Sequence, residues 1–242
     1  HIENLKYISA EDNLIKPSQV VNAVIVAAYN EPYEVIRPTI ESLIETDYSK
    51  ENLMIFFAYE ERGGKEIEKT AKKLQSEFSK KFKAFEIIKH PKDLPNEVIG
   101  KGGNITFAGR ALQKYCEKNK IPFENVLVTT LDCDNKPHAK YFSAATYEFI
   151  IRKDRKHFSY QPISLFLNNI WDAPAPMRVL ATGNSFWNLV VSMRPHLLRN
   201  FASHSQPLDA LVEMDFWSTR TIVEDGHQFW RSYFHFDGKY SV

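Results

Sequence analysis

The stretch Val126-Leu127-Val128-Thr129-Thr130-Leu131-Asp132-Cys133-Asp134 decides the expected fold. The residues before Asp132 are apolar or β-branched and include neither Gly nor Pro, which favours a short, fully buried strand over a helix. Asp132 and Asp134 then follow at the carboxyl end of that strand, where ligands bind in open α/β sheets. Carboxylate oxygens suit Mg²⁺ or Mn²⁺, whose other positions are normally filled by water and substrate phosphates. The stretch therefore predicts a metal-bridged diphosphate site.

The same Asp-x-Asp pair has a simpler explanation. Asp residues at a strand end often form a turn or cap a helix by accepting hydrogen bonds from nearby backbone N–H groups. Short acidic motifs also recur by chance, so the rest of the chain has to decide between the two interpretations.

Composition limits the class of protein. The chain has 242 residues, of which 43% are hydrophobic and 25% charged, enough for one α/β domain with a substantial core. A net charge of +1 argues against a nucleic-acid partner and against a polybasic membrane-binding surface. The two cysteines, Cys116 and Cys133, show neither metal-ligand spacing nor a disulfide framework, which fits a reducing compartment.

No stretch approaches the roughly 20 apolar residues that a membrane helix needs. The chain begins at His1 without a Met and ends at Val242 after an aromatic-rich segment. We therefore expect a cytoplasmic domain excised from a longer protein, in which other segments could hold it at the cytoplasmic face of a membrane.

Strands alternate with helices in the first half of the chain. Apolar runs predict strands, and apolar residues at helical spacing predict helices between them. The expected strands are 20–28, 53–59, 85–88 and 126–131, and the expected helices are 34–44, 65–82 and 105–118. This alternation predicts a mostly parallel, right-handed sheet flanked by helices.

A glycine-rich stretch, residues 100–104, precedes the helix expected at 105–118. Its glycines could let backbone N–H groups approach a phosphate, with Lys101 adding positive charge. The spacing matches neither a Walker loop nor a dinucleotide fingerprint, so a flexible loop is the alternative.

The second half of the chain has a different pattern. We expect helices at 141–151, 208–217 and 228–234, strands at 158–167 and 179–181, and a polar and aromatic loop at 182–187. The chain shows no internal repeat or low-complexity linker. It is therefore interpreted as one domain, with a lead-in (1–19), a nucleotide-binding half (20–136) and an acceptor-binding half (137–242) that carries a smaller mixed sheet.

Taken together, these pieces resemble the family 2 glycosyltransferases with the GT-A fold. The matching motifs occur in the expected order and span the chain from about residue 20 to its end. They are 24–31 (Val-Ile-Val-Ala-Ala-Tyr-Asn-Glu), 101–104 (Lys-Gly-Gly-Asn), Asp132-Cys133-Asp134, Thr182-Gly183-Asn184, and Glu224-Asp225 followed by Arg231.

The resemblance implies roles for individual residues. It implies an inverting enzyme that uses a nucleotide-sugar donor, with UDP favoured, and that transfers the sugar to a hydroxyl of a carbohydrate or lipid-linked acceptor. Mg²⁺ or Mn²⁺ would be the cofactor. The implied nucleotide-binding residues are Ala28, Tyr29, Glu31, Glu60, Lys101 and Asp132, the metal ligands are Asp132 and Asp134, and the diphosphate contact is Arg231. The implied acceptor-binding residues are Thr182, Gly183, Asn184 and Trp187. The implied catalytic residues are the carboxylates of Asp225, as general base, and Glu224.

Two features depart from the family pattern. Glu60-Glu61-Arg62-Gly63 replaces the usual acidic-Gly-Ser sequence, which leaves the base unassigned between UDP and GDP. Gln228-Phe229-Trp230-Arg231 follows the acidic pair at once, whereas processive synthases carry their Gln-x-x-Arg-Trp motif well downstream, so processivity stays open.

Other interpretations of the same residues are open at this stage. Glu224 or Asp225 could simply cap the following helix, and His227 could be a metal ligand, a base or an ordinary surface residue. The chain could be a non-catalytic nucleotide-sugar-binding or scaffold domain. It could also be a sugar-nucleotide nucleotidyltransferase, but the Gly-rich, Arg-containing loop expected after the first strand of such an enzyme is missing from Tyr29-Asn30-Glu31-Pro32.

Overall fold

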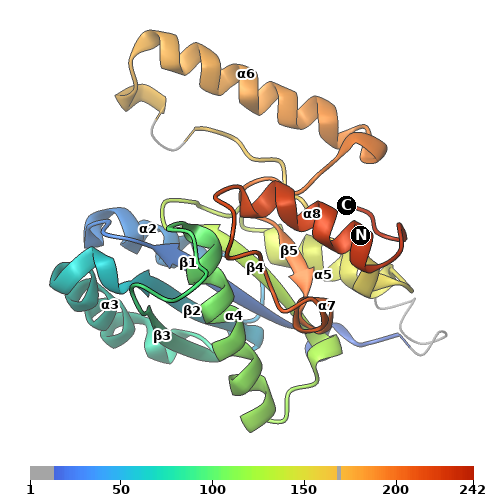
Figure 1. Ribbon diagram of the computed structural model, residues 1–242, viewed down its shortest axis with the longest axis horizontal. Coiled ribbons are helices and arrows are strands. Elements are labelled where there is room, and N and C mark those ends of the chain that lie inside the picture. Colours follow the sequence, from blue (N-terminus) through green and yellow to red (C-terminus); the bar gives the residue numbers. More distant parts are fainter. Residues whose placement is uncertain (1–13, 168–169) are drawn as a thin grey trace.

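A five-stranded sheet forms the centre of the protein (Figure 1). The computed structural model describes residues 14–167 and 170–242. The strands have the order β3-β2-β1-β4-β5; the first four are parallel, and β5 runs antiparallel to β4. Their bounds are β1 Val21–Ala28, β2 Leu53–Glu60, β3 Ala84–His90, β4 Val126–Asp132 and β5 Ser205–Pro207. The predicted mostly parallel α/β sheet is therefore confirmed.

Helices cover both faces of this sheet, which explains why β1, β2 and β4 are almost continuously apolar. Three helices pack on one face: α2 (Tyr33–Ile44), α3 (Gly64–Phe78) and α5 (Tyr141–Ile151). On the other face lie α4 (Lys101–Lys118) and α7 (Leu208–Glu213). The last helix, α8 (Glu224–His235), packs its Phe229 against Ala210 of α7.

The order in which strands are added to the sheet reverses at β1, which has β2 on one side and β4 on the other. The connection through α2 leads from β1 to β2 on one side, whereas β4 pairs with the other side of β1. In register, Ala27 of β1 lies opposite Asp132, and Ala28 lies opposite Tyr59 of β2. This is the switch point at which open α/β sheets bind ligands beyond the carboxyl ends of their strands.

The prediction for residues 179–187 is wrong. The strand expected at 179–181 and the loop expected at 182–187 both belong to one helix, α6 (Ala175–Ser192), with Pro176 in its first turn. A short apolar run does not distinguish a strand from a helical segment, and Pro in the first turn favours helix. The strand expected at 158–167 is limited to two isolated bridges, Phe158 to Ser241 and Tyr160 to Ser205.

Several helix boundaries also differ from the prediction. Helix α3 ends at Phe78 and is followed by a 3-10 turn, η5 (Ser79–Lys81), where the helix was expected to continue to residue 82. Helix α7 ends at Glu213, and α8 begins at Glu224. Within the described part of the chain, no helix combines the length and the apolar character needed to cross a membrane.

Candidate active site

A cavity of about 500 Å³ opens at the carboxyl ends of β1, β2 and β4. The amino end of α4 forms one of its walls. All the residues predicted to bind nucleotide or metal line it: Ala28, Tyr29, Glu31, Glu60, Lys101, Asp132 and Asp134. The rest of the lining is Ala27, Val35, Arg62, Ile99, Gly100, Asn104 and Cys133. The fold therefore brings together residues that lie more than a hundred positions apart in sequence.

Lys101 and Asp132 form an ion pair in this cavity. Asp132 is the last residue of β4 and Lys101 is the first residue of α4, and the Lys101 Nζ lies 2.5 Å from Asp132 Oδ1. The free N–H groups of the first turn of α4 add partial positive charge beside the lysine. An anionic group entering the cavity here would meet both the ammonium and the helix end.

Asp134 sits in a concentration of negative charge. Its burial, followed by the charges of Asp132 and Glu31, raises the pKa of its carboxyl group, although Lys101 opposes the shift. A divalent cation would relieve this repulsion, and carboxylate oxygens are the ligands that Mg²⁺ and Mn²⁺ prefer. Across residues 14–167 and 170–242, no group of three or more His, Cys, Asp or Glu side chains forms a metal site. The carboxylates of Asp132 and Asp134 are oxygen ligands of the kind that suits such an ion when substrate phosphates and water complete its shell.

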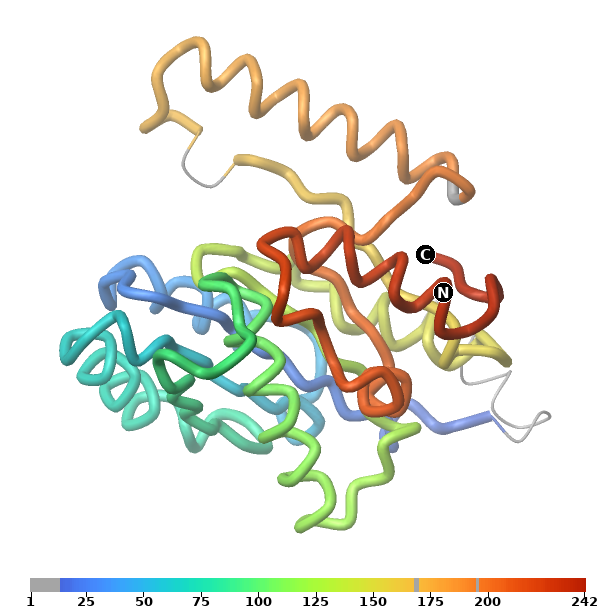
Figure 2. The backbone as a smooth tube through the Cα atoms, in the orientation of Figure 1, coloured from blue at the N-terminus to red at the C-terminus, as the bar shows by residue number. Residues whose placement is uncertain are grey.

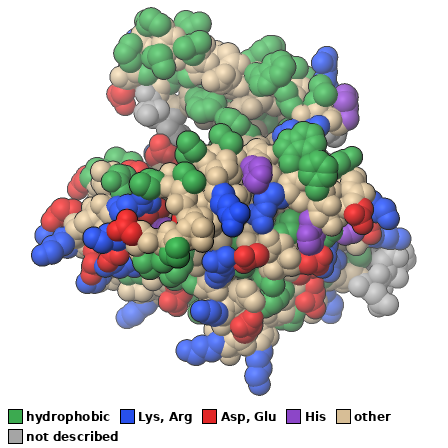
Figure 3. Space-filling model, in the orientation of Figure 1, with side chains coloured by type: hydrophobic (Ala, Val, Ile, Leu, Met, Phe, Trp, Pro, Cys, Tyr) green, Lys and Arg blue, Asp and Glu red, His purple; other side chains and the backbone are tan. Residues whose placement is uncertain are grey.

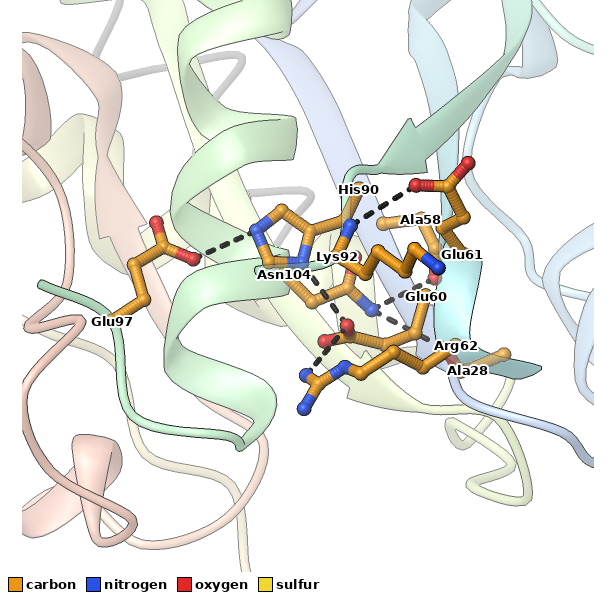
Figure 4. A network of polar contacts seen from close by, with 9 residues as sticks. All are labelled: Ala28, Ala58, Glu60, Glu61, Arg62, His90, Lys92, Glu97 and Asn104. Carbon is orange, nitrogen blue, oxygen red and sulfur yellow. Dashed lines mark hydrogen bonds and ion pairs between the residues drawn. The ribbon is translucent and has the colours of Figure 1, made fainter. Parts of the chain in front are cut away.

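A buried polar network surrounds Glu60 at the end of β2 (Figure 4). Its Oε2 accepts hydrogen bonds from Arg62 Nη2 at 2.8 Å and from His90 Nδ1 at 3.1 Å, and His90 Nε2 lies 2.9 Å from Glu97 Oε2. Burial alone would raise the pKa of Glu60, but the bonds from His90 and Arg62 outweigh it and lower the pKa. Burial likewise opposes protonation of His90, but Glu60 and Glu97 raise its pKa overall. Glu60 is therefore an ionised carboxylate that faces the cavity in a fixed orientation.

The loop 91–100 is tied to this network. Glu97 bonds His90, and the next residue, Val98, donates its N–H to the carbonyl oxygen of Thr219 at 2.8 Å. These contacts place Ile99 and Gly100 at the cavity. Sequence analysis missed both His90 and Glu97, which lie in a proline-containing stretch. Their proximity to Glu60 follows from the pairing of β2 with β3, which sets Glu60 opposite His90 and has no local signal in the sequence.

The glycine-rich stretch is not a flexible loop. Helix α4 begins at Lys101, four residues earlier than predicted, so Gly102 and Gly103 lie in its first turn. A Cβ on Gly102 would lie only 2.4 Å from the carbonyl oxygen of Ser218, so the missing side chain allows close packing. Asn104 Nδ2 donates to the carbonyl oxygens of Ala28 and Ala58, at 3.3 and 3.2 Å. Asn104, which belongs to the 101–104 motif but was given no role of its own from the sequence, thereby ties α4 to the ends of β1 and β2 (Figure 4).

The acidic pair Glu224-Asp225 lies in the first turn of α8, next to the first turn of α4. Val223 is the N-cap of α8, so neither acid caps the helix in the predicted sense. Glu224 is buried; burial raises its pKa, with Lys101 opposing the shift and Asp132 adding to it. Asp225 accepts hydrogen bonds from Gly226 N at 2.7 Å and from Ala202 N at 2.6 Å. Neither Glu224 nor Asp225 lines the cavity, but Glu224 is close enough to Lys101 to feel its charge.

His204 is a further buried residue near this pair that sequence analysis missed. It is 2% exposed, and its Nδ1 lies 3.2 Å from the carbonyl oxygen of Ala202. Burial, with a contribution from the Lys101 charge, lowers the pKa of His204 to about 4, so the imidazole is neutral near pH 7. No feature of the sequence around Ser203-His204-Ser205 distinguishes it from an ordinary core histidine.

Other residues selected from the sequence lie elsewhere. Arg231 donates from Nη1 to the carbonyl oxygen of Phe216 at 2.6 Å and from Nη2 to that of Met214 at 2.7 Å, so its guanidinium holds the chain after α7. The geometry therefore does not support its expected contact with a diphosphate. Exposed His227 is also outside the cavity lining. The four expected acceptor residues, Thr182, Gly183, Asn184 and Trp187, are on exposed sides of α6 and not at the cavity.

Comparison with solved structures identifies the fold. The chain superposes on the mannosyltransferase PcManGT from Pyrobaculum calidifontis, solved in complex with GDP-Man and Mn²⁺, with a TM-score of 0.54 and 13% identity. The match covers 93% of this chain and 56% of that one. The S. aureus protein TarS, in the structure of its residues 1–349 in complex with UDP-GlcNAc, gives a TM-score of 0.49 at 12% identity, covering 88% of this chain and 53% of that one. The first match shows that the chain shares the fold of that mannosyltransferase. The chain spans about half the length of the structures it matches.

No protein-family model and no curated protein matches the sequence. Membership of family 2 is therefore a resemblance carried by the motifs. The assignment of an activity depends on the geometry of the cavity.

Proposed function

We propose that this chain is the catalytic domain of an inverting glycosyltransferase that uses a nucleotide-sugar donor and a divalent cation. One observation carries the proposal: the cavity at the switch point of the sheet is lined by Ala28, Tyr29, Glu31, Glu60, Lys101, Asp132 and Asp134, which the motifs assign to nucleotide or metal. The GT-A-like fold supports the same reaction class.

The donor would lie along the cavity with its diphosphate near Lys101 and Asp132. The ammonium group of Lys101 and the first turn of α4 would attract the phosphate oxygens. Asp132 and Asp134 would hold Mg²⁺ or Mn²⁺, which supplies positive charge to the diphosphate. The base would meet Glu60, whose carboxylate accepts N–H groups and therefore suits either uracil or guanine. UDP is favoured by the family resemblance alone.

The reaction would be a single displacement. The acceptor hydroxyl attacks the anomeric carbon while the bond from that carbon to the diphosphate oxygen breaks, and the nucleoside diphosphate leaves with the bonding electrons. Asp225 would take the proton of the hydroxyl, as general base. Its bonds from Ala202 N and Gly226 N would fix the orientation of the carboxylate. One displacement inverts the anomeric centre and needs no covalent nucleophile.

The test compares binding with turnover. We would measure binding of a panel of UDP- and GDP-sugars by calorimetry, with and without Mn²⁺ or Mg²⁺, and donor hydrolysis in the same samples. The variants are Asp134→Ala, Asp225→Asn and the control Asp237→Asn. Asp237 is exposed, lies outside the cavity, and has a φ of 51°, a conformation that Asn adopts readily.

The proposal requires a specific pattern of results. Asp134→Ala should abolish the metal-dependent part of donor binding, Asp225→Asn should bind the donor but lose hydrolysis, and Asp237→Asn should match the unaltered chain. If Asp134→Ala and Asp225→Asn both bind and turn over normally, the assigned roles are wrong. If donor binds with metal but nothing turns over with any acceptor, the chain is a binding domain.

A further inference from the structure

Helix α6 stands apart from the body of the protein (Figures 1 and 2). Its main contacts are with the short turns next to it in sequence, η8 (Ile170–Asp172) and η9 (Pro195–Leu197). No residue of α6 is buried. A helix that covers a protein core normally buries an apolar stripe, so α6 does not have this role.

The apolar side of α6 faces outward. Large side chains recur seven residues apart, which is about two helical turns, and therefore share one side of the helix. We call the following residues the α6 patch: Val179, Leu180, Phe186, Trp187 and Met193, the last at the helix C-cap, which are 73%, 61%, 66%, 65% and 69% exposed. Figure 3 shows the resulting hydrophobic surface on this part of the molecule.

The side of α6 that faces the rest of the chain carries polar side chains, while Thr182, Gly183 and Asn184 are exposed. Ser185 Oγ accepts a hydrogen bond from Phe166 N at 3.0 Å, and Asn188 Nδ2 donates to the carbonyl oxygen of Ser164 at 3.3 Å. Both side chains are less exposed than those of the patch. The orientation is the reverse of that of a surface helix in water, where the polar side is solvated, so an apolar environment is expected against the patch.

The segment of the chain that carries the α6 patch is mainly basic. Between Ser159 and Leu208 the only acidic residue is Asp172, whereas three arginines occur: Arg178, Arg194 and Arg199. Arg194, next to Met193 of the patch, is exposed, whereas Arg178 stacks on Trp171 and Arg199 on Phe229 and Trp230. A second copy docked patch to patch would bring together two mainly basic segments that offer few carboxylates to each other. An anionic phospholipid surface would supply the missing negative charge. Exposed tryptophans, here Trp187 and 81%-exposed Trp171, are typical of the boundary between headgroups and acyl chains.

We propose that α6 docks this protein on an anionic phospholipid bilayer, lying in the interfacial plane with the α6 patch inserted among the acyl chains. This is monotopic binding by the chain itself, and it adds to the proposed transferase activity without depending on it. Apolar insertion and the arginines contribute separately, so two kinds of variant distinguish them.

The test is flotation of the 242-residue protein with vesicles of phosphatidylcholine alone or of phosphatidylcholine with phosphatidylglycerol. We expect binding to the anionic vesicles, and we expect the double variant Phe186→Ser/Trp187→Ser to bind at least tenfold more weakly. Arg194→Gln should weaken binding about fivefold on the anionic vesicles and little on the neutral ones. Because these side chains are exposed, the thermal unfolding midpoint should stay unchanged in all variants.

A matched control is Phe234→Ser on α8, because Phe234 is 70% exposed and belongs to another helix. It should bind vesicles as the unaltered chain does. Brominated lipids should also quench tryptophan fluorescence, and Trp187→Phe should remove much of that quenching.

Three results would overturn the proposal. One is the absence of binding to either kind of vesicle. Another is an equal loss of binding in Phe234→Ser, which would indicate general adhesion. The third is a dimer in solution that the double variant dissociates, which would show that a second copy covers the patch.

Discussion

The substitution His90→Gln tests the charge network beneath the nucleotide cavity. His90 is 3% exposed and bonds Glu60 and Glu97 through its two ring nitrogens. Removing one partner of a buried ion pair costs about 3–5 kcal/mol when the remaining charge is left uncompensated. Here Arg62 still donates to Glu60 at 2.8 Å, so we expect a loss of about 2–3 kcal/mol in the free energy of unfolding. For a chain of this size that corresponds to about 5–10 °C in the unfolding midpoint.

The sign of the pH dependence follows from the pKa of His90. Folding raises this pKa, so the folded state holds the proton more tightly than the unfolded chain, in which the pKa is about 6.5. The stabilisation that protonated His90 contributes through Glu60 and Glu97 is therefore fully present below about pH 6.5. It is lost as the pH rises through the folded-state pKa of His90. We expect the difference in stability between the unaltered chain and His90→Gln to be largest at pH 6 and to shrink towards pH 9.

Urea unfolding at pH 6, 7.5 and 9 provides the measurement. The control is His235→Gln, because His235 forms a similar 2.9 Å contact with Glu213 but on the surface, with side-chain exposures of 35% and 45%. Exposed pairs contribute up to about 1 kcal/mol, so this variant should change little. If His90→Gln lowered the free energy of unfolding equally at pH 6 and pH 9, His90 would be neutral in the folded protein. The conclusion that a protonated His90 helps to keep Glu60 ionised would then be wrong.

Four further substitutions test packing and charge, three of them in α4 and one, Gly183→Ala, in α6. Gly109→Ala would place a Cβ 2.4 Å from Cδ1 of buried Phe216 and should destabilise the chain by about 1–2 kcal/mol in urea, whereas Gly183→Ala, with nothing within 4 Å, should stabilise it by up to about 1 kcal/mol. Asn104→Ala should cost about 1–3 kcal/mol, because two buried carbonyl oxygens lose their donor; unchanged stability would mean that water replaces the amide. Lys101→Met should weaken nucleoside diphosphate binding about tenfold or more in calorimetry and reduce its salt dependence; equal affinity would place the diphosphate elsewhere.

The sequence by itself determined the sheet and most of the cavity. Each strand of the first half is an apolar run that ends in polar residues, and parallel strands joined by helices bring their carboxyl ends to one edge. Asp132 and Asp134 were placed at the end of one such strand, and the family resemblance assigned Glu31 and Glu60 to the nucleotide; all four line the cavity. This much is local information: strand period, chain direction and the point at which each run ends.

Only the tertiary structure decided the groups that support the cavity. His90 and Glu97 meet Glu60 because β2 and β3 pair in one register and the loop 91–100 folds back, and neither event has a local sequence signal. The side-chain amide of Asn104 bonds to two strand ends because α4 begins at Lys101, earlier than the sequence predicted.

The tertiary structure also decided the second half of the chain. Residues 179–187 were expected to form a strand and a loop at the acceptor side, but they belong to α6, and Val179, Leu180, Phe186 and Trp187 lie on its exposed side. A hydrophobic pattern shows that a side chain avoids water, but it does not show what replaces the water. For the strands the replacement is the core of the protein; for α6 the described chain offers none, because the helix presents its polar side to its own protein.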